Sequence, residues 1–239
     1  MNPFVLRYPG RFLVIGKDPS AGSGQAAYVA IYGATGRSPS SLARRFVREN
    51  DGVYMTAVDG TVSKEKNPEL FEYPAVRFFR NGIVVANGRH IDDIVELQSR
   101  DARQQISYAL AEEAYEPDEN HTPRITGCLI ESNGKMDAAV HIVRYAADGI
   151  DRSSWSVPLE AGKGSFISTY AGEDARPAPS FPGRPVPVDL AFGSARDAAK
   201  AIFDSFAPPS GAQDYRVGVV ALYGKLGGQP EIAIVNRIA

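Results

Sequence analysis

Residues 75–86 read AVRFFRNGIVVA, which places two short apolar runs on either side of Asn81-Gly82. Asn-Gly between such runs is a strong β-hairpin signal, because both residues tolerate the positive φ that a type I′ turn requires. The same signal returns at Asn133-Gly134, between the apolar runs 125–131 and 137–145. The middle of the chain is therefore predicted to form antiparallel sheet.

Further strands are predicted on both sides of these hairpins, from short apolar runs bounded by turn residues. They cover residues 11–16, 25–32, 53–59, 164–170, 216–222 and 231–236. The last two are expected to pair as a hairpin. The stretch 17–24 is rich in turn residues, and Gly22-Ser23-Gly24 within it is interpreted as plain loop.

Helical spacing appears in two places. Between residues 91 and 114 apolar residues recur at helical intervals with a break near Ser99, and Pro117 ends the pattern. Ser194, with Asp197 three residues later, resembles a capping box and opens a second helix. Between these regions, five prolines in the stretch 172–187 predict an irregular surface loop or connector.

The resulting element order is β-meander, helices, β-meander, helix and β-hairpin. This order indicates an α+β fold in which helices pack outside antiparallel sheets, rather than alternating βαβ units. No repeat or low-complexity tract divides the chain, so one domain over residues 1–239 is predicted.

Composition excludes several classes of partner. The chain has 239 residues, with 26 Lys plus Arg against 28 Asp plus Glu, a net charge of −2 and a pI near 6.0. Nucleic-acid binders usually carry a basic excess, so no nucleic-acid partner is predicted. No apolar run approaches a membrane span and the N-terminus lacks a signal-peptide core, so we expect a cytoplasmic location and no membrane partner.

The cysteine and histidines argue against a metal or disulfide site. Cys128 is the only cysteine, and its place in an apolar run indicates a buried hydrophobe. His90, His121 and His141 lack metal-type spacing, so no metal is predicted. The phosphate-binding, dinucleotide-binding and nucleophile-elbow motifs are also absent, and no cofactor is predicted.

Polar residues gather at the ends of the predicted elements, where sites are usually built. The densest cluster, residues 114–124, holds three acids, an arginine and two prolines. Pro117 should force Glu116 out of helical conformation, just past a helix end whose negative dipole would raise the pKa of Glu116. Such a carboxyl group suits general acid-base catalysis near neutral pH, although a solvated acidic helix end has the same pattern.

Three other clusters carry groups that bind anions or polar ligands. Residues 37–45 form a turn rich in serine and arginine that suits a phosphate. Residues 87–90 lie between a strand and a helix, where backbone amides favour anions. Residues 167–170 end a strand with hydroxyl groups. None of these clusters indicates a function by itself.

Taken together, six segments carry a resemblance to a known family. They are Tyr8-Pro9-Gly10-Arg11, Gly36-Arg37-Ser38, Asn67-Pro68 with Tyr73, Asn87-Gly88 with His90, Tyr115-Glu116 with Thr122-Pro123-Arg124-Ile125, and Ile167-Ser168-Thr169-Tyr170. In this order they resemble the archaeal-type inosine monophosphate (IMP) cyclohydrolase family over about residues 8–172. Bacterial members look similar and carry a C-terminal extension like residues 173–239.

The resemblance implies a four-layer αββα sandwich of antiparallel sheets, like that of the N-terminal nucleophile hydrolases, with residues 173–239 in the same domain. Residue 2 is Asn and the only cysteine is internal, so the N-terminal nucleophile itself is not expected. The implied reaction closes the purine ring of 5-formamido-1-(5-phosphoribosyl)imidazole-4-carboxamide, and it gives IMP and water without metal or cofactor.

The resemblance also implies roles for individual residues. Arg44, or Arg45 beside it, is expected to face the formyl oxygen. Tyr73 is expected to hydrogen-bond or protonate that oxygen, and Glu116 to transfer a proton at the carboxamide. The residues expected to bind base, ribose or phosphate are Arg11, Arg37, Asn87, His90, Arg124, Ser168 and Tyr170.

Two other functions stay open at this point. The same scaffold can serve an amide or formyl hydrolase acting on a related nucleotide, or a purine nucleotide-binding protein without catalysis. The product distinguishes a hydrolase from a cyclohydrolase, because a hydrolase would not close the ring. A binding protein would bind the nucleotide without turnover. In each case the partner is a small purine nucleotide. The sequence does not fix the oligomeric state, and a homo-oligomer is compatible with it.

Overall fold

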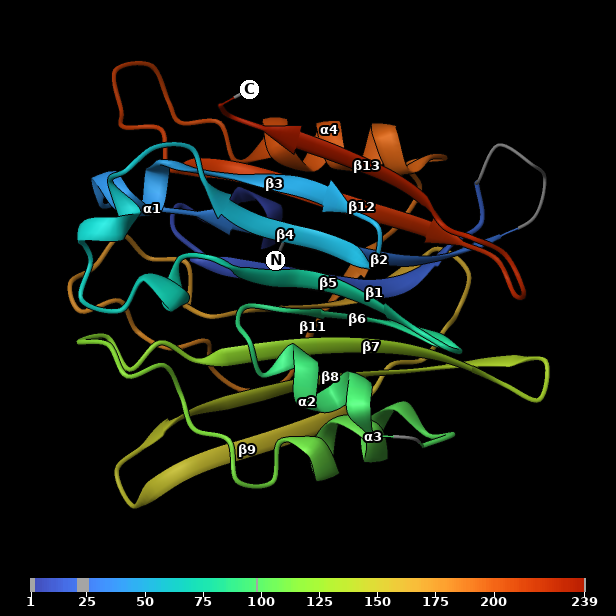
Figure 1. Ribbon diagram of the computed structural model, residues 1–239. Coiled ribbons are helices and arrows are strands. Elements are labelled where there is room, and N and C mark those ends of the chain that lie inside the picture. Colours follow the sequence, from blue (N-terminus) through green and yellow to red (C-terminus); the bar gives the residue numbers. More distant parts are fainter. Residues whose placement is uncertain (1–2, 21–25, 98, 239) are drawn as a thin grey trace.

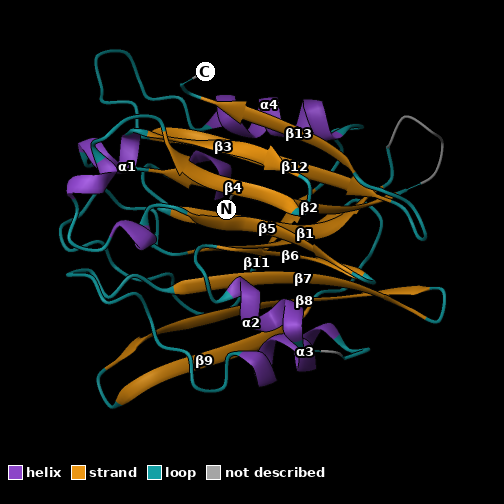
Figure 2. Cartoon of the chain, in the orientation of Figure 1, coloured by secondary structure: helices purple, strands orange, loops and turns teal. Residues whose placement is uncertain are grey.

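The computed structural model describes residues 3–20, 26–97 and 99–238. In this part of the chain two antiparallel sheets make up most of the fold (Figures 1 and 2). One has six strands in the order β11-β10-β1-β2-β12-β13, and the other has seven in the order β3-β4-β5-β6-β7-β8-β9. The fold is α+β, as predicted.

The bounds of the elements are as follows. The six-stranded sheet holds β1 (Arg11–Asp18), β2 (Ala27–Thr35), β10 (Lys163–Ser168), β11 (Val186–Asp189), β12 (Arg216–Gly224) and β13 (Glu231–Asn236). The seven-stranded sheet holds β3 (Arg44–Glu49), β4 (Gly52–Ala57), β5 (Tyr73–Phe79), β6 (Gly82–Ala86), β7 (Arg124–Ser132), β8 (Lys135–Ala146) and β9 (Gly149–Ser156). The helices are α1 (Pro39–Leu42), α2 (Ile91–Glu96), α3 (Ala102–Ala109) and α4 (Ala195–Ser205), with short 3-10 turns η1 (Pro3–Val5), η2 (Val62–Lys64) and η3 (Pro68–Leu70).

The two sheets face each other across the main core. β1 contacts β7 and β8, β2 contacts β6, and β12 contacts β3. β1 and β2 are buried along almost their whole length, because one face meets the other sheet and the opposite face meets the outer layer. Strands covered on both faces are expected to be nearly continuous apolar runs, and these two are.

Helices lie on the outer faces of the sandwich (Figure 1). α4 packs on β12 and β13, whereas α2 and α3 pack on the strands β5 to β9. Ser194 caps α4 by accepting a hydrogen bond from the backbone N–H of Asp197, as the capping-box pattern predicted. The layers therefore follow the order helix, sheet, sheet, helices. Among the described residues no helix has the length and apolar character needed to cross a bilayer.

The predicted hairpins are confirmed. Asn133-Gly134 joins β7 to β8 with both residues at positive φ, but the turn between β5 and β6 is Arg80-Asn81, because Gly82 is already the first residue of β6 and pairs with Phe79. β12 and β13 also pair as expected. The predicted loop Gly22-Ser23-Gly24, and Gln25 at the start of the second predicted strand, lie outside the described residues.

Other predictions were wrong in part. The helical pattern of residues 91–114 forms two helices separated near Ser99, as predicted, but the second ends at Ala109, well before Pro117. β3 and β9 were not predicted, because their exposed positions break the apolar alternation. The proline-rich stretch 172–187 was expected to hold no regular element, yet β11 begins at Val186. β11 is an edge strand, where Pro187 costs no ladder hydrogen bond.

Candidate active site

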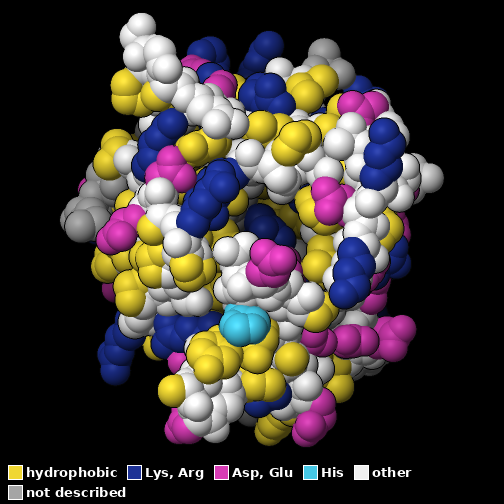
Figure 3. Space-filling view, turned by 90° about the vertical axis from the view of Figure 1, so that its left-hand side faces the viewer, with side chains coloured by type: hydrophobic (Ala, Val, Ile, Leu, Met, Phe, Trp, Pro, Cys, Tyr) yellow, Lys and Arg dark blue, Asp and Glu magenta, His cyan; other side chains and the backbone are white. Residues whose placement is uncertain are grey.

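A cavity of about 480 Å³ opens at one end of the sandwich. Its walls come from three segments distant in sequence, 38–44, 65–71 and 116–120, together with Tyr8, Arg11 and Tyr170. Figure 3 views the molecule from the side on which α1 lies in Figure 1, and it shows a hollow near the middle of this face with Lys or Arg side chains inside it. Three of the predicted clusters therefore meet in one place.

Glu116 and Arg11 form a buried ion pair at this cavity. Arg11 Nη2, at the start of β1, donates to both carboxylate oxygens of Glu116, at 2.9 and 2.7 Å. Asn87, directly after β6, donates its Nδ2 to Glu116 Oε1 at 2.8 Å. The other groups of the Asn87 amide bond the backbone of Pro123 and Ile125. Asn87 is thus saturated by protein contacts and fixes the orientation of the Glu116 carboxylate.

Glu116 lies in a compact loop rather than at a helix end. Its backbone N–H donates to the carbonyl of Thr122, and the Asp118 carboxylate accepts both the N–H and the hydroxyl of Thr122. Burial raises the pKa of Glu116, and the positive charges of Arg11 and Arg124 oppose that rise. The predicted direction of the pKa shift is confirmed, but its predicted cause is wrong, because α3 ends at Ala109.

Arg44 is a buried cation that has no acidic partner in the described parts of the chain. Its side chain is 2% exposed and lines the cavity. Its Nε donates to the carbonyl of Ser41 at 3.0 Å and its Nη1 to the carbonyl of Phe71 at 3.3 Å. A buried charge without a counter-ion is costly, unless a ligand supplies the opposite charge. Arg45 is half-buried and is not among the cavity residues.

Tyr73 lies at the start of β5, just after the cavity-lining Phe71, and is 2% exposed. Its hydroxyl is 2.9 Å from the hydroxyl of Tyr32 on β2. The Tyr73 side chain is close enough to Arg11 and Arg44 to influence the pKa of both guanidinium groups. Tyr73 therefore lies near the two arginines of the cavity wall, although it is not itself among the residues that line the cavity.

Tyr170 lines the opposite wall and belongs to a chain of hydroxyl groups. Its hydroxyl lies 2.6 Å from Thr122 Oγ1, whose proton is donated to Asp118. Because the Thr122 hydroxyl already donates its proton to Asp118, the Tyr170 hydroxyl donates to Thr122, and its oxygen can still accept a hydrogen bond from a ligand. Ser168 is buried and donates to the carbonyl of Tyr170, so it supports this backbone instead of lining the cavity.

Five predicted binding residues do not line the cavity: Asn87 and Ser168, described above, and Arg37, His90 and Arg124. Arg37 borders a wider, shallower hollow that shares Tyr8 and Ser38 with the cavity and continues its mouth. His90 is buried, with Nε2 at 3.0 Å from Thr126 Oγ1. Arg124 pairs with Glu113 at 2.7 Å. His90 and Arg124 thus form a layer behind Asn87 and Glu116 rather than a surface for a ligand.

Sequence reasoning missed several residues at the cavity. Asp118 and Tyr8 stand within quoted segments but were given no role, and Lys66 was not considered at all. Tyr32 gave no signal, since it stands in an apolar strand. The acidic side chain of Asp118, two residues after Glu116, was the one clue that could have been used.

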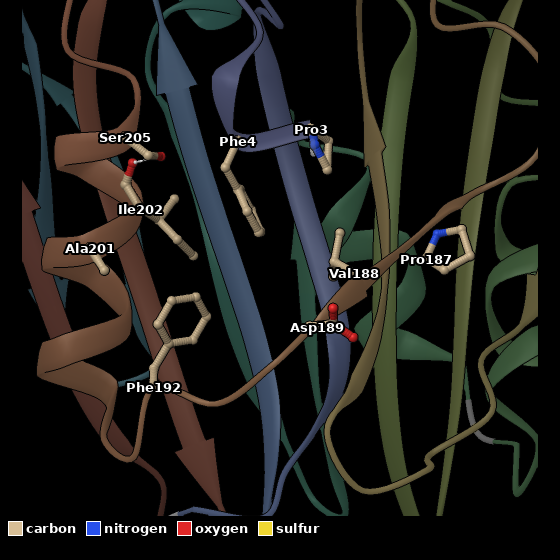
Figure 4. A pocket seen from close by; sticks show the side chains of 9 residues that line it. All are labelled: Pro3, Phe4, Pro187, Val188, Asp189, Phe192, Ala201, Ile202 and Ser205. Atoms are coloured by element: carbon tan, nitrogen blue, oxygen red, sulfur yellow. Dashed lines mark hydrogen bonds between the residues drawn. The ribbon is translucent and has the colours of Figure 1, made fainter. Parts of the chain in front are cut away.

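A second cavity, of about 510 Å³, lies under α4 and differs in its chemistry. Phe4, Val188, Phe192 and Ile202 point into it, and Asp189 is the only charged residue in its lining (Figure 4). The Asp189 side chain is 85% exposed and pairs with Lys163. No buried charge faces this cavity among the described residues that line it, so it lacks groups for acid-base chemistry. Within the described residues, no cluster of three or more His, Cys, Asp or Glu is arranged for a metal ion.

Comparisons with known proteins agree with the resemblance seen in the sequence. A family model described as IMP cyclohydrolase-like protein matches residues 8–223. The chain is 31% identical over 164 residues to the IMP cyclohydrolase of Methanocaldococcus jannaschii, which covers 68% of this chain and 73% of that protein. It is 30% identical over 213 residues to the IMP cyclohydrolase of Halobacterium salinarum, covering 88% and 94% of the two chains.

Proposed function

Since the chain belongs to the IMP cyclohydrolase-like family, we propose that it is an IMP cyclohydrolase. Its substrate is 5-formamido-1-(5-phosphoribosyl)imidazole-4-carboxamide, and its products are IMP and water. One observation supports this proposal most strongly. A buried, unpaired guanidinium (Arg44) and a buried carboxylate (Glu116) line the same cavity.

The ring closure needs both charges. The carboxamide nitrogen attacks the formyl carbon, so a carbon–nitrogen bond forms and the carbonyl electron pair moves to the formyl oxygen. Arg44 stabilises the negative charge on that oxygen, and a preorganised donor of this kind is typically worth about 10² to 10³ in rate. The negative charge that develops on the formyl oxygen thus acts as the counter-ion of Arg44.

Two protein groups carry the protons in this first step. Glu116 accepts a proton from the carboxamide nitrogen as the bond forms, and Tyr73 donates its proton to the formyl oxygen. Burial raises the pKa of Glu116 and makes it a stronger base than an ordinary carboxylate. The result is a cyclic carbinolamine, with protonated Glu116 and a Tyr73 phenolate beside Arg11 and Arg44.

The second step removes water and restores both groups. Protonated Glu116 returns its proton to the hydroxyl group, whose bond to carbon breaks, and water leaves. The N–H proton of the former formamide goes to the Tyr73 phenolate, directly or through solvent, as the ring double bond forms. Atoms and charges balance, and no metal or cofactor takes part in these steps.

Positioning is the other contribution of the site. Nucleophile and electrophile belong to one molecule, so the cavity has to hold the two arms in contact. Tyr170 offers an acceptor for a ligand hydroxyl or N–H, while Arg11 and Asn87 act through Glu116. We assign the phosphate to the mouth of the cavity, where Arg37 and Lys66 lie near Ser38 and Ser41.

We further propose that residues 1–239 form one domain related to the N-terminal nucleophile hydrolases. Support comes from the layer order and from β12 and β13, which extend the sheet that β1 and β2 begin. The predicted cytoplasmic location and homo-oligomer stay proposals of the same kind.

Mixing the purified chain with the formamido ribonucleotide tests the function. Absorbance and chromatography should identify IMP, and the dephosphorylated nucleoside should be converted at least about 10-fold less efficiently, as expected for loss of a charge-assisted contact. Release of formate would instead indicate a hydrolase, and binding without any product a nucleotide-binding protein. Equal efficiency with the nucleoside would reject the phosphate assignment.

A further inference from the structure

Tyr32, in the middle of β2, carries a hydroxyl group for which packing alone gives no reason. Its ring is fully buried between the two sheets and meets Phe46 of β3 edge-on, with 5.7 Å between ring centroids. Its hydroxyl oxygen lies 2.9 Å from that of Tyr73. A phenylalanine would fill the same space without burying a polar group, so the hydroxyl calls for a separate explanation.

Hydrogen-bond accounting gives the direction of this contact once the substrate of the proposed reaction is bound. Each phenol has a single proton, and within the described residues the Tyr32 hydroxyl has no partner besides Tyr73. If Tyr73 were the donor, the Tyr32 proton would be buried without an acceptor, which is unfavourable. If Tyr32 is the donor, its proton is satisfied, and the Tyr73 proton is left for the formyl oxygen that the proposed reaction brings beside it.

The charges around the pair favour the same arrangement. The Arg11 and Arg44 guanidinium groups act on Tyr32, and the Tyr73 side chain in turn influences the pKa of both arginines. Both cations therefore lie near the Tyr32–Tyr73 pair. Burial raises the pKa of Tyr32 well above its usual value, and the neighbouring Tyr73 adds to the rise. Tyr32 is consequently the phenol that keeps its proton.

We propose that Tyr32 is a positioning residue for the ring closure, which donates a hydrogen bond to Tyr73 and thereby directs the Tyr73 proton toward the formyl oxygen. The inference rests on the proposed function. When Tyr73 has given up its proton, the bond from Tyr32 becomes charge-assisted and stronger. Tyr32 thus stabilises the transition state more than the bound substrate, and its effect falls on kcat.

The kinetic test compares Tyr32→Phe with Tyr28→Phe, the same exchange on the same strand but at the far end, where Tyr28 lines a different hollow. Tyr32→Phe should lower kcat about 10-fold and change KM less than about 2-fold, whereas Tyr28→Phe should change neither. In a Tyr73→Phe background the Tyr32→Phe exchange should have almost no effect, because no phenol remains to be oriented. Equal losses in both backgrounds would overturn the proposal, since they indicate a purely structural role.

A second measurement does not need turnover. In protein labelled with ¹³C at the tyrosine Cζ, NMR in mixed H₂O and D₂O reports how fast each hydroxyl proton exchanges. The Tyr32 hydroxyl should exchange far more slowly than that of Tyr108, which is 67% exposed, and Tyr73→Phe should speed it up. Fast exchange at Tyr32 that Tyr73→Phe leaves unchanged would contradict the proposed direction.

The two possible failures are distinguishable. A wild-type chain that makes no IMP rejects the proposed function, and the catalytic role of Tyr32 falls with it. Normal IMP formation combined with no coupling between Tyr32 and Tyr73 rejects the role of Tyr32 alone.

Discussion

The molecule contains two regions of buried polar side chains, and they differ in charge. At the cavity, Arg44 and the Arg11–Glu116 pair keep formal charges, and Arg44 has no counter-ion among the described residues. Under α2 and α3, a second group consists of His90 with Thr126 and His141 with Ser154. Burial lowers the pKa of His141 to about 4 and that of His90 well below its usual value, so this group is neutral.

The comparison shows that burial of polar groups alone does not identify a site. In the histidine group each ring has a neutral hydrogen-bond partner, Thr126, His141 and Ser154 stand side by side in register, and the helices cover them. His141 Nε2 has no partner among the described residues, but it carries no charge. The cavity group is open to a ligand and carries charge that the protein does not balance. The unbalanced charge points to chemistry, because a buried charge destabilises the fold unless a ligand interacts with it.

Glu116→Gln should have the largest effect. The amide cannot accept the carboxamide proton, so turnover should fall by roughly 10² to 10⁴. Steady-state kinetics on the formamido ribonucleotide measures this, with circular dichroism to confirm folding. Near-normal turnover would remove Glu116 from the mechanism. The buried charges of the cavity would then have no more claim to a catalytic role than the histidine group.

Arg44→Gln should have the second-largest effect on turnover, with kcat lowered about 10² to 10³-fold. Its thermal midpoint should not fall, since the change removes a buried charge without a counter-ion. Arg45→Gln is the matched control on the next residue of β3, and it should keep turnover within about 3-fold. An Arg44 variant that unfolds while retaining activity per folded molecule would show that the cation serves the fold.

The pH profile of kcat/KM gives a smaller but specific effect. Glu116 must be ionised to act as a base, and burial raises its pKa. Activity should therefore be lost as the pH falls through a midpoint above the ordinary glutamate value of about 4.3. Rates measured from pH 4.5 to 8, on samples that stay folded, test this. A profile that is flat across this range would contradict the raised pKa.

His141→Gln should have the smallest effect on the reaction. Turnover should stay within about 3-fold, whereas the free energy of unfolding should fall by about 1 kcal/mol, because the half-buried Ser154 loses its hydrogen bond to the imidazole and keeps the one to Ser107. Denaturant titration and kinetics on the same preparation measure both. A collapse of turnover in a fully folded variant would mean that the histidine group takes part in catalysis.

The parts of this structure that could be predicted from the sequence depend on local signals. The two Asn-Gly hairpins and the Ser194 cap follow from residues that are neighbours in the chain. Pro117 correctly predicted that Glu116 is not helical, but its place beyond a helix end was wrong. The reason for its raised pKa was not predicted either, because burial beside β1 and β6 is a long-range effect.

The site itself was less accessible to sequence reasoning. Arg44, Tyr73 and Glu116 were named through a family resemblance, and no pattern in the chain brings β3, β5 and the 116–122 loop together. Tyr32 was missed altogether, since a tyrosine in an apolar strand is indistinguishable from an ordinary core residue. Its role is visible only when β2 and β5 face each other across the core.

The central claim is that the cavity between Arg44 and Glu116 is where the ring closes. A crystal structure of the chain with bound IMP tests this most directly. We expect the purine base to lie in this cavity, with the newly formed edge of its six-membered ring facing Arg44 and Glu116. The phosphate should point toward Arg37. IMP bound only in the cavity under α4, or anywhere beyond the reach of Arg44 and Glu116, would contradict it.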